Sequence, residues 1–411
     1  MIDNQSQSGP GGSSLARRIN EQLVLEAIFL HGPLSRVTVA SLTGLSKPTV
    51  SSIVDGLVDA GLVHQNGRTS GGIGRTAALY SVDRRVGHVI AMDLGGTKVT
   101  GAIADLYGKV LAERTEPTQK QSPEALLEQL GNLARGLAED AGVDWVAVRS
   151  LAIGVPGTVD PTSGRITLAY NIPDLSEISL AEELAKLGVG LQVVVENDVN
   201  VAAIGERWQG WAKDSDHFAF VAIGTGIGAG VVVNGELCRG LGGAAGEIGY
   251  LPFGEDPFDP GMHLRGPLEE SISGRGIVAD VRRRLAQGQS SDLAEDCTAA
   301  DVFAAAADGD PLALECIDRE ARMIAMTVAG LAAVIAPEMV VLGGGIGANE
   351  LLIEPVRRYS RELTAKPLRI EQSALGPRAA LVGALSLGLQ AAREVVLSPP
   401  SGMPKAESEG D

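Results

Sequence analysis

The sequence predicts an α/β protein in which a small winged helix-turn-helix domain precedes a body of two similar lobes. An apolar strand, a glycine turn and a second apolar strand occur at residues 87–113 and again at residues 218–240. This repeat indicates a duplicated lobe, because solenoid repeats recur about every 20–50 residues. Near the N-terminus, two short helical segments joined by a tight turn at Gly44 are typical of a helix-turn-helix.

Composition places the chain among cytoplasmic globular proteins. The 411 residues are enough for two or three domains, and 45% of them are hydrophobic. The three cysteines have no paired spacing, which favours a reducing compartment over a disulfide framework. The polar N-terminus lacks an apolar signal core, and no apolar run approaches the roughly 20 residues that span a bilayer. We therefore expect no membrane partner.

Charge is distributed unevenly along the chain. The whole sequence carries a net charge of −17, but residues 15–85 hold eight Lys or Arg against five Asp or Glu. A basic head on an acidic body is expected of a DNA-binding module attached to a metabolic domain. A solvated helical surface would give the same modest excess of positive charge.

Residues 15–82 are predicted to form the winged helix-turn-helix domain, after a disordered tail at 1–14. The first helix, 15–31, is expected to face the core with Ile19, Leu23, Ile28 and Leu30. Two further helices at 36–43 and 47–60 each follow a serine suited to N-capping. Two short strands around a glycine-rich tip then form the wing.

Operator contacts are expected from the start of the third helix and from the wing. Short polar side chains at the N-terminus of a recognition helix reach base edges and phosphates, and an arginine on a wing enters the minor groove. A winged helix used only for protein contacts is the alternative. The predicted DNA-binding residues are Ser46, Lys47, Thr49, Ser51, Ser52, Arg68 and Arg75.

The glycine turns of the body are candidate phosphate-binding sites. Glycine lets backbone N–H groups turn toward an anion, and the preceding Asp93 is suited to hold a hydrated Mg²⁺. An ordinary hairpin turn is the alternative. A third glycine turn follows the apolar strand 339–342. The predicted nucleotide-binding residues are Asp93, Gly95, Gly96, Thr97, Lys98, Gly224, Thr225, Gly226, Gly344 and Gly345.

Other elements follow from apolar periodicity. Helices are predicted at 122–140, 299–307 and 311–335, where apolar residues recur at helical spacing. The strand 148–155 ends in the turn GVPGTVD, which we expect to face the cleft between the lobes.

Four motifs in this order resemble the ROK family of sugar kinases and sugar-responsive repressors: DLGGTK, IGTGIGAG, the segment ENDVN at 196–200, and GEIG at 246–249. The resemblance extends from about residue 15 to 395 of the sequence. It implies a two-lobed actin/hexokinase-type fold, which is a duplicated ribonuclease H-like unit. The expected lobes are 87–197 and 198–376, with a closing helix at 377–395 that returns to the first lobe and a disordered tail at 397–411.

The resemblance also implies a sugar site. In family kinases the aspartate at the place of Asp198 is the catalytic base, since phosphoryl transfer needs a carboxylate to accept the hydroxyl proton. A helix N-cap role for Asp198 and a turn-capping role for Asn171 are the alternatives. The implied sugar-binding residues are Asn171, Asn197, Asp198, Glu247, Tyr250 and Glu269.

One segment departs from the family pattern. Tyr250 stands where family kinases have a zinc-ligating histidine, and residues 251–274 contain no cysteine. A tetrahedral zinc site needs four suitable ligands, so we expect no zinc and no other resident metal. Mg²⁺-ATP remains the expected nucleotide ligand of the glycine turns, but the departure weakens the case for catalysis.

The favoured function is a sugar-responsive DNA-binding regulator, a repressor of carbohydrate metabolism genes. Its expected partners are operator DNA, a sugar or sugar phosphate, and a second copy in a homodimer or homotetramer. The alternative is an ATP-dependent sugar kinase, acting on a hexose or N-acetylhexosamine, with a regulatory DNA-binding head. A purely structural interaction protein would explain neither the glycine turns nor the wing.

Overall fold

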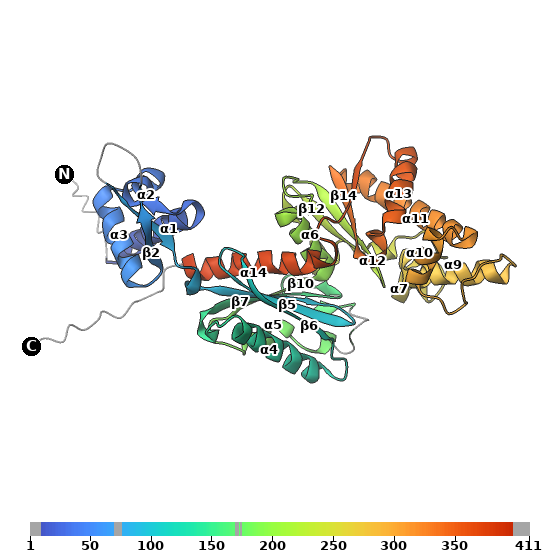
Figure 1. Cartoon of the computed structure of the whole chain (residues 1–411), viewed down its shortest axis with the longest axis horizontal. Helices are drawn as coiled ribbons and strands as arrows, with labels where there is room; N and C mark the ends of the chain where they lie inside the picture. Colours follow the sequence, from blue (N-terminus) through green and yellow to red (C-terminus); the bar gives the residue numbers. More distant parts are fainter. Residues whose placement is uncertain (1–9, 70–75, 169–171, 173–174, 398–411) are drawn as a thin grey trace, which may run out of the picture.

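The computed structural model describes residues 10–69, 76–168, 172 and 175–397. Figure 1 shows the N-terminal domain at one end of an elongated molecule and the two lobes beyond it. The N-terminal domain has a three-stranded sheet in the order β1-β3-β2. Its elements are α1 (Pro10–His31), β1 (Leu34–Ser35), α2 (Arg36–Thr43), α3 (Lys47–Asp59), β2 (Val63–Arg68) and β3 (Ala78–Val82).

The caps of the helix-turn-helix form as predicted. The Ser35 hydroxyl accepts a hydrogen bond from the Thr38 amide at 3.1 Å and starts α2. Gly44 ends that helix in the left-handed region at φ 71°, where glycine has no steric penalty. Ser46 accepts from the Thr49 amide at 3.3 Å and starts α3. Each cap satisfies a backbone donor that the helix itself leaves free.

The first helix differs from expectation in two ways. It begins at Pro10, inside the segment expected to be a disordered tail. Its buried apolar residues are Val24, Leu25, Ile28 and Phe29, whereas Ile19, Leu23 and Leu30 are 50%, 41% and 64% exposed. The helical period and the burial of Ile28 were predicted correctly, but the other three predicted core residues are exposed, because periodicity does not say which of two apolar faces meets the core.

Each lobe contains a five-stranded mixed sheet of the same topology. The orders are β10-β7-β4-β5-β6 and β13-β12-β11-β14-β15, with an antiparallel meander followed by two parallel strands in each. The first sheet comprises β4 (His88–Leu94), β5 (Lys98–Asp105), β6 (Val110–Pro117), β7 (Val148–Val155) and β10 (Gln192–Asn197). The second comprises β11 (Phe218–Ile223), β12 (Ile227–Val233), β13 (Glu236–Leu237), β14 (Met339–Gly343) and β15 (Arg369–Gln372).

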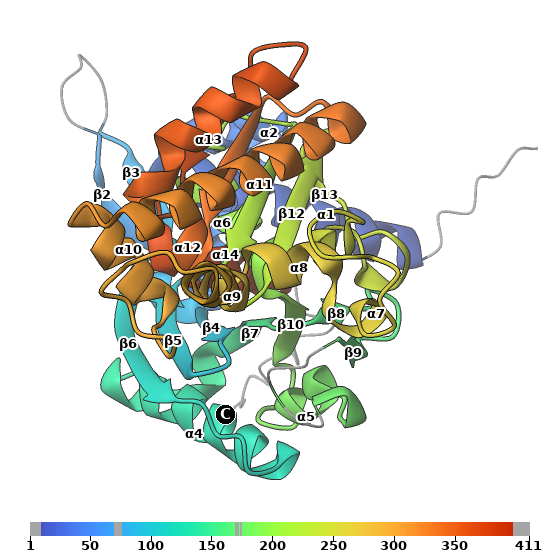
Figure 2. The ribbon, with the colours of Figure 1, turned by 90° about the vertical axis from the view of Figure 1, so that its right-hand side faces the viewer.

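Helices cover both faces of each sheet, so the central strands are buried on both sides. Figure 2 shows α4 (Pro123–Asp140) and α5 (Leu180–Ala185) below the first sheet, and α11 (Pro311–Ile335) and α13 (Glu350–Leu363) on the outer side of the second. The side chains of β4 alternate accordingly: Ile90 and Met92 pack in the core with α4, while Val89 and Ala91 pack in the core with α14 (Ala379–Leu397).

Shorter elements complete the chain. A small sheet pairs β8 (Thr158–Val159) with β9 (Ile166–Thr167). The remaining α-helices are α6 (Asp198–Gln209), α7 (Met262–Arg265), α8 (Pro267–Ile272), α9 (Gly274–Ala286), α10 (Ala299–Ala307) and α12 (Gly344–Gly347). The 3-10 turns are η1 (Arg84–Val86), η2 (Trp145–Ala147), η3 (Leu175–Glu177), η4 (Leu241–Gly243), η5 (Ile248–Tyr250) and η6 (Gly376–Arg378).

The helices α6 and α14 connect the parts of the molecule. They cross at Gly205 and Gly383, where a Cβ atom on either glycine would overlap the backbone of the other helix. From this crossing α14 runs along β4 and β7 and reaches α1 of the N-terminal domain. At its far end the Arg393 guanidinium lies 4.8 Å from the centre of the Phe29 ring. A single helix therefore contacts both the crossing and the N-terminal domain.

The membrane expectation needs one correction. The stretch Gly376–Leu397, which includes α14, is 22 residues long and apolar enough to cross a membrane by length and composition. Half of it is buried inside the molecule, and core helices of soluble proteins share this composition.

Candidate functional site

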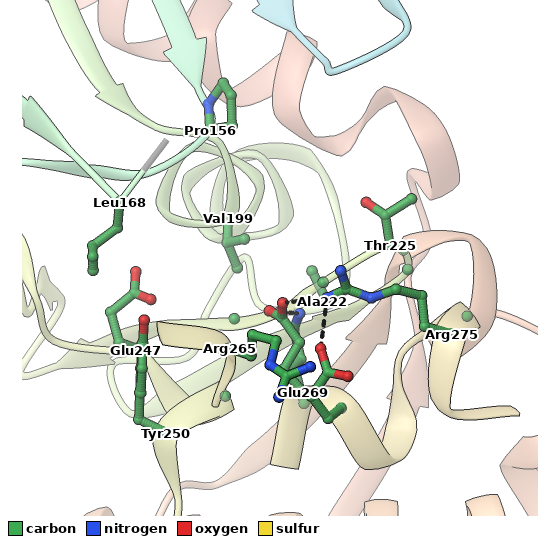
Figure 3. Close-up of a pocket in the computed structure, with 18 of the residues that line it drawn as sticks. Pro156, Leu168, Val199, Ala222, Thr225, Glu247, Tyr250, Arg265, Glu269 and Arg275 are labelled. Carbon is green, nitrogen blue, oxygen red and sulfur yellow. Dashed lines mark hydrogen bonds and ion pairs between the residues drawn. The ribbon is translucent and has the colours of Figure 1, made fainter. Parts of the chain in front are cut away.

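A cavity of about 1130 Å³ lies between the two lobes. Pro156 and Gly157 line it from the first lobe, as expected for the GVPGTVD turn. Figure 3 shows Leu168, Glu247 and Tyr250 at one end and Thr225 with Arg275 at the other, with Glu269 between them. Small-ligand pockets are typically about 300–1,000 Å³, so the cavity is at the large end of the range for a ligand site.

Asn197 and Asp198 stand at the junction of β10 with α6. The Asn197 side chain caps α6, accepting from the Asn200 amide at 2.9 Å, so the N-cap role weighed for Asp198 falls to its neighbour. Asn197 also donates to the Gly157 carbonyl at 3.0 Å. One Asp198 carboxylate oxygen accepts from the Val199 amide at 2.9 Å and from Asn197 at 3.2 Å. Asp198 is therefore held at the cavity wall by its own helix start.

Two aspartates lie near the carboxyl ends of the parallel strands. Asp93, the last residue but one of β4, pairs with Gly154 of β7, and Gly154 lies against Asp198: a Cβ built on that glycine would be 3.5 Å from the Asp198 Cα. Burial, and then the charge of Asp93, raise the pKa of Asp198 to about 7. Burial raises the pKa of Asp93 to about 6, against the opposing effect of Lys98. Asp198 is thus poised to exchange a proton near neutral pH.

Carboxylates also line the far side of the cavity. Glu247 and Tyr250 both line this side, and their polar ends point the same way in Figure 3. Glu269 accepts from the Ile227 amide at 3.2 Å. Burial raises the pKa of both glutamates, and the charge of Glu269 adds to the effect on Glu247. These are hydrogen-bond acceptors of the kind that bind sugar hydroxyls.

Only some of the predicted nucleotide-binding residues line the cavity. Gly224, Thr225, Gly226 and Gly344 line the cavity. Gly344 has φ +76° and lies against the Ile223 backbone, so only glycine fits there. The cavity wall does not include the predicted residues Asp93, Gly95, Gly96, Thr97, Lys98 and Gly345. The second lobe thus supplies most of this wall.

The sequence analysis missed the arginines of the cavity. Arg275, at the start of α9, pairs with Glu269 at 3.2 Å and with Glu270 at 3.1 Å. Arg265 and Arg282 line the same wall. No motif marked them, because α8 and α9 meet at Ser273 and their relative direction follows from that bend.

The predicted DNA-binding residues have different local surroundings in the N-terminal domain. Ser46, Lys47, Ser52 and Arg68 are exposed. Ser46 and Thr49 are hydrogen-bonded to each other in the α3 cap, with their hydroxyls 2.7 Å apart. Ser51 accepts from Arg36 at 2.6 Å and so faces α2. The predicted residues Arg75 and Asn171 lie outside the described residues.

Arg36 was not predicted as a site residue, and it holds α3 in place within the N-terminal domain. It pairs with Asp55 of α3 at 2.5 Å and lies 5.0 Å from the centre of the Tyr80 ring in the wing. It therefore connects α2, α3 and β3.

The described part of the chain contains no group of three or more His, Cys, Asp or Glu side chains placed to hold a metal ion. Cys238, Cys297 and Cys316 are free thiols, respectively exposed, half-buried and buried.

Comparison with known proteins places these features in context. The ROK family model matches residues 89–391. The xylose repressor of Caldicellulosiruptor bescii is 30% identical over 92% of this chain and 97% of its own length. A crystal structure of a ROK family transcriptional regulator, a homolog of the Escherichia coli MLC protein, is 28% identical, covers 93% of this chain and 98% of its own, and gives a TM-score of 0.75. A ROK family glucokinase from Streptomyces griseus, solved with glucose and AMPPNP, is 30% identical and covers 74% of this chain and 100% of its own, with a TM-score of 0.62.

Proposed function

The chain belongs to the ROK family, and we propose that it is a sugar-responsive transcriptional repressor of carbohydrate metabolism genes. In this proposal residues 15–82 bind operator DNA, and the cavity between the lobes, built on 87–197 and 198–376, binds a sugar or sugar phosphate. The helix around 377–395 joins the two. We expect the protein to work in the cytoplasm.

The observation that carries the proposal is how the relatives align. The glucokinase aligns along its entire length yet leaves about a quarter of this chain unmatched. The repressor and the regulator align over nearly all of it. The family match begins at residue 89, after a helix-turn-helix and wing that end at Val82. A kinase does not need this additional domain, whereas a repressor needs it to bind DNA.

The cavity and the N-terminal domain are physically connected. A ligand that contacts Asn197 of the first lobe and Glu269 of the second touches both lobes, and α6, which follows Asn197, crosses α14. The other end of α14 contacts Phe29 of α1 through Arg393. A sugar that binds one arrangement of the lobes better than the other therefore shifts the equilibrium between positions of the N-terminal domain.

The test is operator binding by the full chain. Operator fragments are selected from genomic DNA, and fluorescence anisotropy then measures their affinity with and without xylose, glucose and N-acetylglucosamine. We expect one sugar to change the affinity by about 5–150-fold, the usual range of allosteric coupling. Asp198→Asn should remove the sugar response and keep DNA binding. Failure to select any specific fragment would contradict the proposal.

A second candidate function, an ATP-dependent sugar kinase, is favoured by one observation. Asp198 lies in the cavity with a pKa near 7, which suits a general base. The cavity also fits a nucleotide, because Gly224 to Gly226 and Gly344 form part of its wall without side chains, apart from Thr225. Asp93 is close enough for its charge to raise the pKa of Asp198, and its carboxylate would hold Mg²⁺. Bound Mg²⁺-ATP would supply the phosphoryl group.

This chain's own residues would then position and activate the sugar. Asn197 holds the loop at Gly157 against the cavity, Glu269 accepts a sugar hydroxyl, and Asp198 takes the proton of the attacking hydroxyl. A coupled ADP-release assay distinguishes a kinase from a sugar sensor. It is run over hexoses, N-acetylhexosamines and pentoses, with Asp198→Ala as control. Turnover lost in the variant establishes a kinase, whereas no turnover with any sugar leaves the cavity as a sensor.

A further inference from the structure

The ion pairs of Arg275 lie between two chemically different ends of the cavity. Figure 3 shows Glu247 at one end, Thr225 and Arg275 at the other, and Glu269 between them. Among the described residues, Arg275 is the arginine of this wall that pairs with carboxylates of the cavity. The cavity therefore offers hydrogen-bond acceptors to a sugar at one end and a cation to an anionic group at the other.

The fold places Arg275 beside the second glycine turn, Gly224 to Gly226. The Gly274 amide donates to the Gly224 carbonyl at 2.9 Å, so α9 begins directly on this turn. Among the described residues, no acceptor is found for the backbone amides of Thr225 and Gly226. The 13-residue helix α9 has no side-chain cap, and its N-terminal N–H groups and dipole also favour an anion. Together these groups are suited to bind a phosphate group.

Arg275 also occupies a carboxylate oxygen that a sugar would need. Glu269 accepts from the Ile227 amide at Oε2 and from the Arg275 guanidinium at Oε1, each at 3.2 Å. Close packing fixes this carboxylate, because a Cβ atom on Gly226 would be 2.9 Å from Oε2. A sugar hydroxyl that donates to Oε1 must therefore replace the guanidinium.

The contacts that hold Arg275 are weak. Its side chain is 62% exposed. The carboxylate of Glu270 lies 3.1 Å from the same Arg275 nitrogen, but its Oε1 accepts no hydrogen bond among the described residues. Exposed ion pairs contribute little to stability, whereas a phosphate accepts two parallel hydrogen bonds from one guanidinium. A phosphate group on the glycine turn is therefore expected to draw Arg275 away from Glu269.

We propose that Arg275 couples the two ends of the cavity: a phosphate group bound at Gly224 to Gly226 takes Arg275 from Glu269, and Glu269 then accepts a sugar hydroxyl. The phosphate belongs either to a nucleotide or to a phosphorylated sugar. Phosphate and sugar then bind with positive cooperativity, and each raises the affinity of the other by the same factor. Coupling of this kind rests on sugar binding in the cavity, which both proposed functions share.

Isothermal titration calorimetry on the full chain tests the coupling. Xylose, glucose and N-acetylglucosamine are titrated with and without an excess of Mg²⁺-AMPPNP, and the phosphate esters of the same sugars are titrated alone. At least one sugar should bind about tenfold more tightly with AMPPNP or as its phosphate ester, within the usual range of coupling. An effect of AMPPNP identifies a nucleotide as the source of the phosphate, and an effect of the ester alone identifies a sugar phosphate. Equal sugar affinities in all arms would overturn the proposal.

Arg275→Gln distinguishes this role from a merely structural one, because the affinities for sugar and phosphate should change in opposite directions. Loss of the guanidinium leaves Glu269 accessible, so the plain sugar should bind about tenfold more tightly than to the original chain. Binding of AMPPNP alone should weaken, and neither AMPPNP nor esterification should strengthen sugar binding further. Weaker binding of both ligands, or coupling that is unchanged, would contradict the proposal.

Arg322→Gln is the matched control. It removes a guanidinium that is also 62% exposed, from an ion pair with Asp318 on α11, and it should leave both affinities and their coupling unchanged. No step uses DNA, so the coupling can fail while the repressor function stands. Sugar binding without any response to phosphate would refute the coupling alone, whereas no sugar binding in any arm would refute the cavity as the sugar site and the coupling with it.

Discussion

Gly383 of α14 lies directly on the Val201 carbonyl oxygen of α6, closer than any side chain would allow. Gly205 stands on the other side of the crossing, against the Ala379 carbonyl oxygen. Two backbones in contact cannot shift independently, so movement of α6 at the cavity is passed to α14. This contact connects the start of α6 at the cavity with α14, whose other end contacts the N-terminal domain.

Gly383→Ala should destabilise the protein by about 1–3 kcal/mol, because its methyl group would overlap the α6 backbone and force the helices apart. Thermal unfolding measures the loss. Gly330→Ala is the matched control: that glycine is exposed in α11 with no atom near its Cβ position, so alanine should stabilise the protein by up to about 1 kcal/mol. Equal effects of the two variants would show that the crossing is not tight.

Sugar binding should depend on pH through Asp198. Its pKa is raised to about 7, so the carboxyl is neutral well below pH 7 and ionised above it. The ionised form is the stronger acceptor for a sugar hydroxyl, so affinity should rise between pH 6 and pH 8. Isothermal titration calorimetry with the responsive sugar measures the change, and Asp198→Asn should flatten it. The same slope in that variant would exclude Asp198 as the titrating group.

Substitutions of exposed cations in the N-terminal domain should affect operator affinity differently from a substitution of Ser51, which has a structural role. Lys47→Ala and Arg68→Ala should each weaken binding and reduce the slope of log affinity against log salt by about 1, if each contacts one phosphate. Ser51→Ala should leave the salt slope unchanged, because Ser51 bonds Arg36 inside the domain. Lys366→Ala, an exposed lysine of the second lobe, is the control. A smaller slope with Lys366→Ala would place the DNA elsewhere.

Glu320 should make the protein less stable as pH rises. It is fully buried in α11, both carboxylate oxygens are without a hydrogen-bond partner among the described residues, and burial raises its pKa well above the usual value. Above about pH 4.5 the unfolded chain loses this proton while the folded protein keeps it. Each pH unit up to the folded pKa therefore costs about 1.4 kcal/mol.

Glu320→Gln should remove that dependence. Its advantage in melting temperature over the original chain should be small at pH 5 and grow toward pH 8. Glu338→Gln serves as the control, because its carboxylate is hydrogen-bonded to Ser215 at 3.0 Å. An advantage that does not change with pH would mean that Glu320 is ionised in the folded protein.

Signals local in the sequence predict many of the helices, strands and turns of this protein. The caps Ser35 and Ser46, the turn at Gly44, the two meanders and the helices at 299–307 and 311–335 all form where the sequence indicates. They depend on interactions between residues close in the chain, which composition and periodicity report directly.

Contacts between distant residues were decided by the tertiary structure. Periodicity predicted that α1 is a helix and that Ile28 faces the core, but it did not predict that Ile19 would be exposed, because either face offers apolar residues. Nor could it place Arg275 between Glu269 and Glu270 or move Ser51 toward Arg36. Sequence spacing determines a helix and its faces; which face is covered, and by what, depends on packing between segments far apart in the chain.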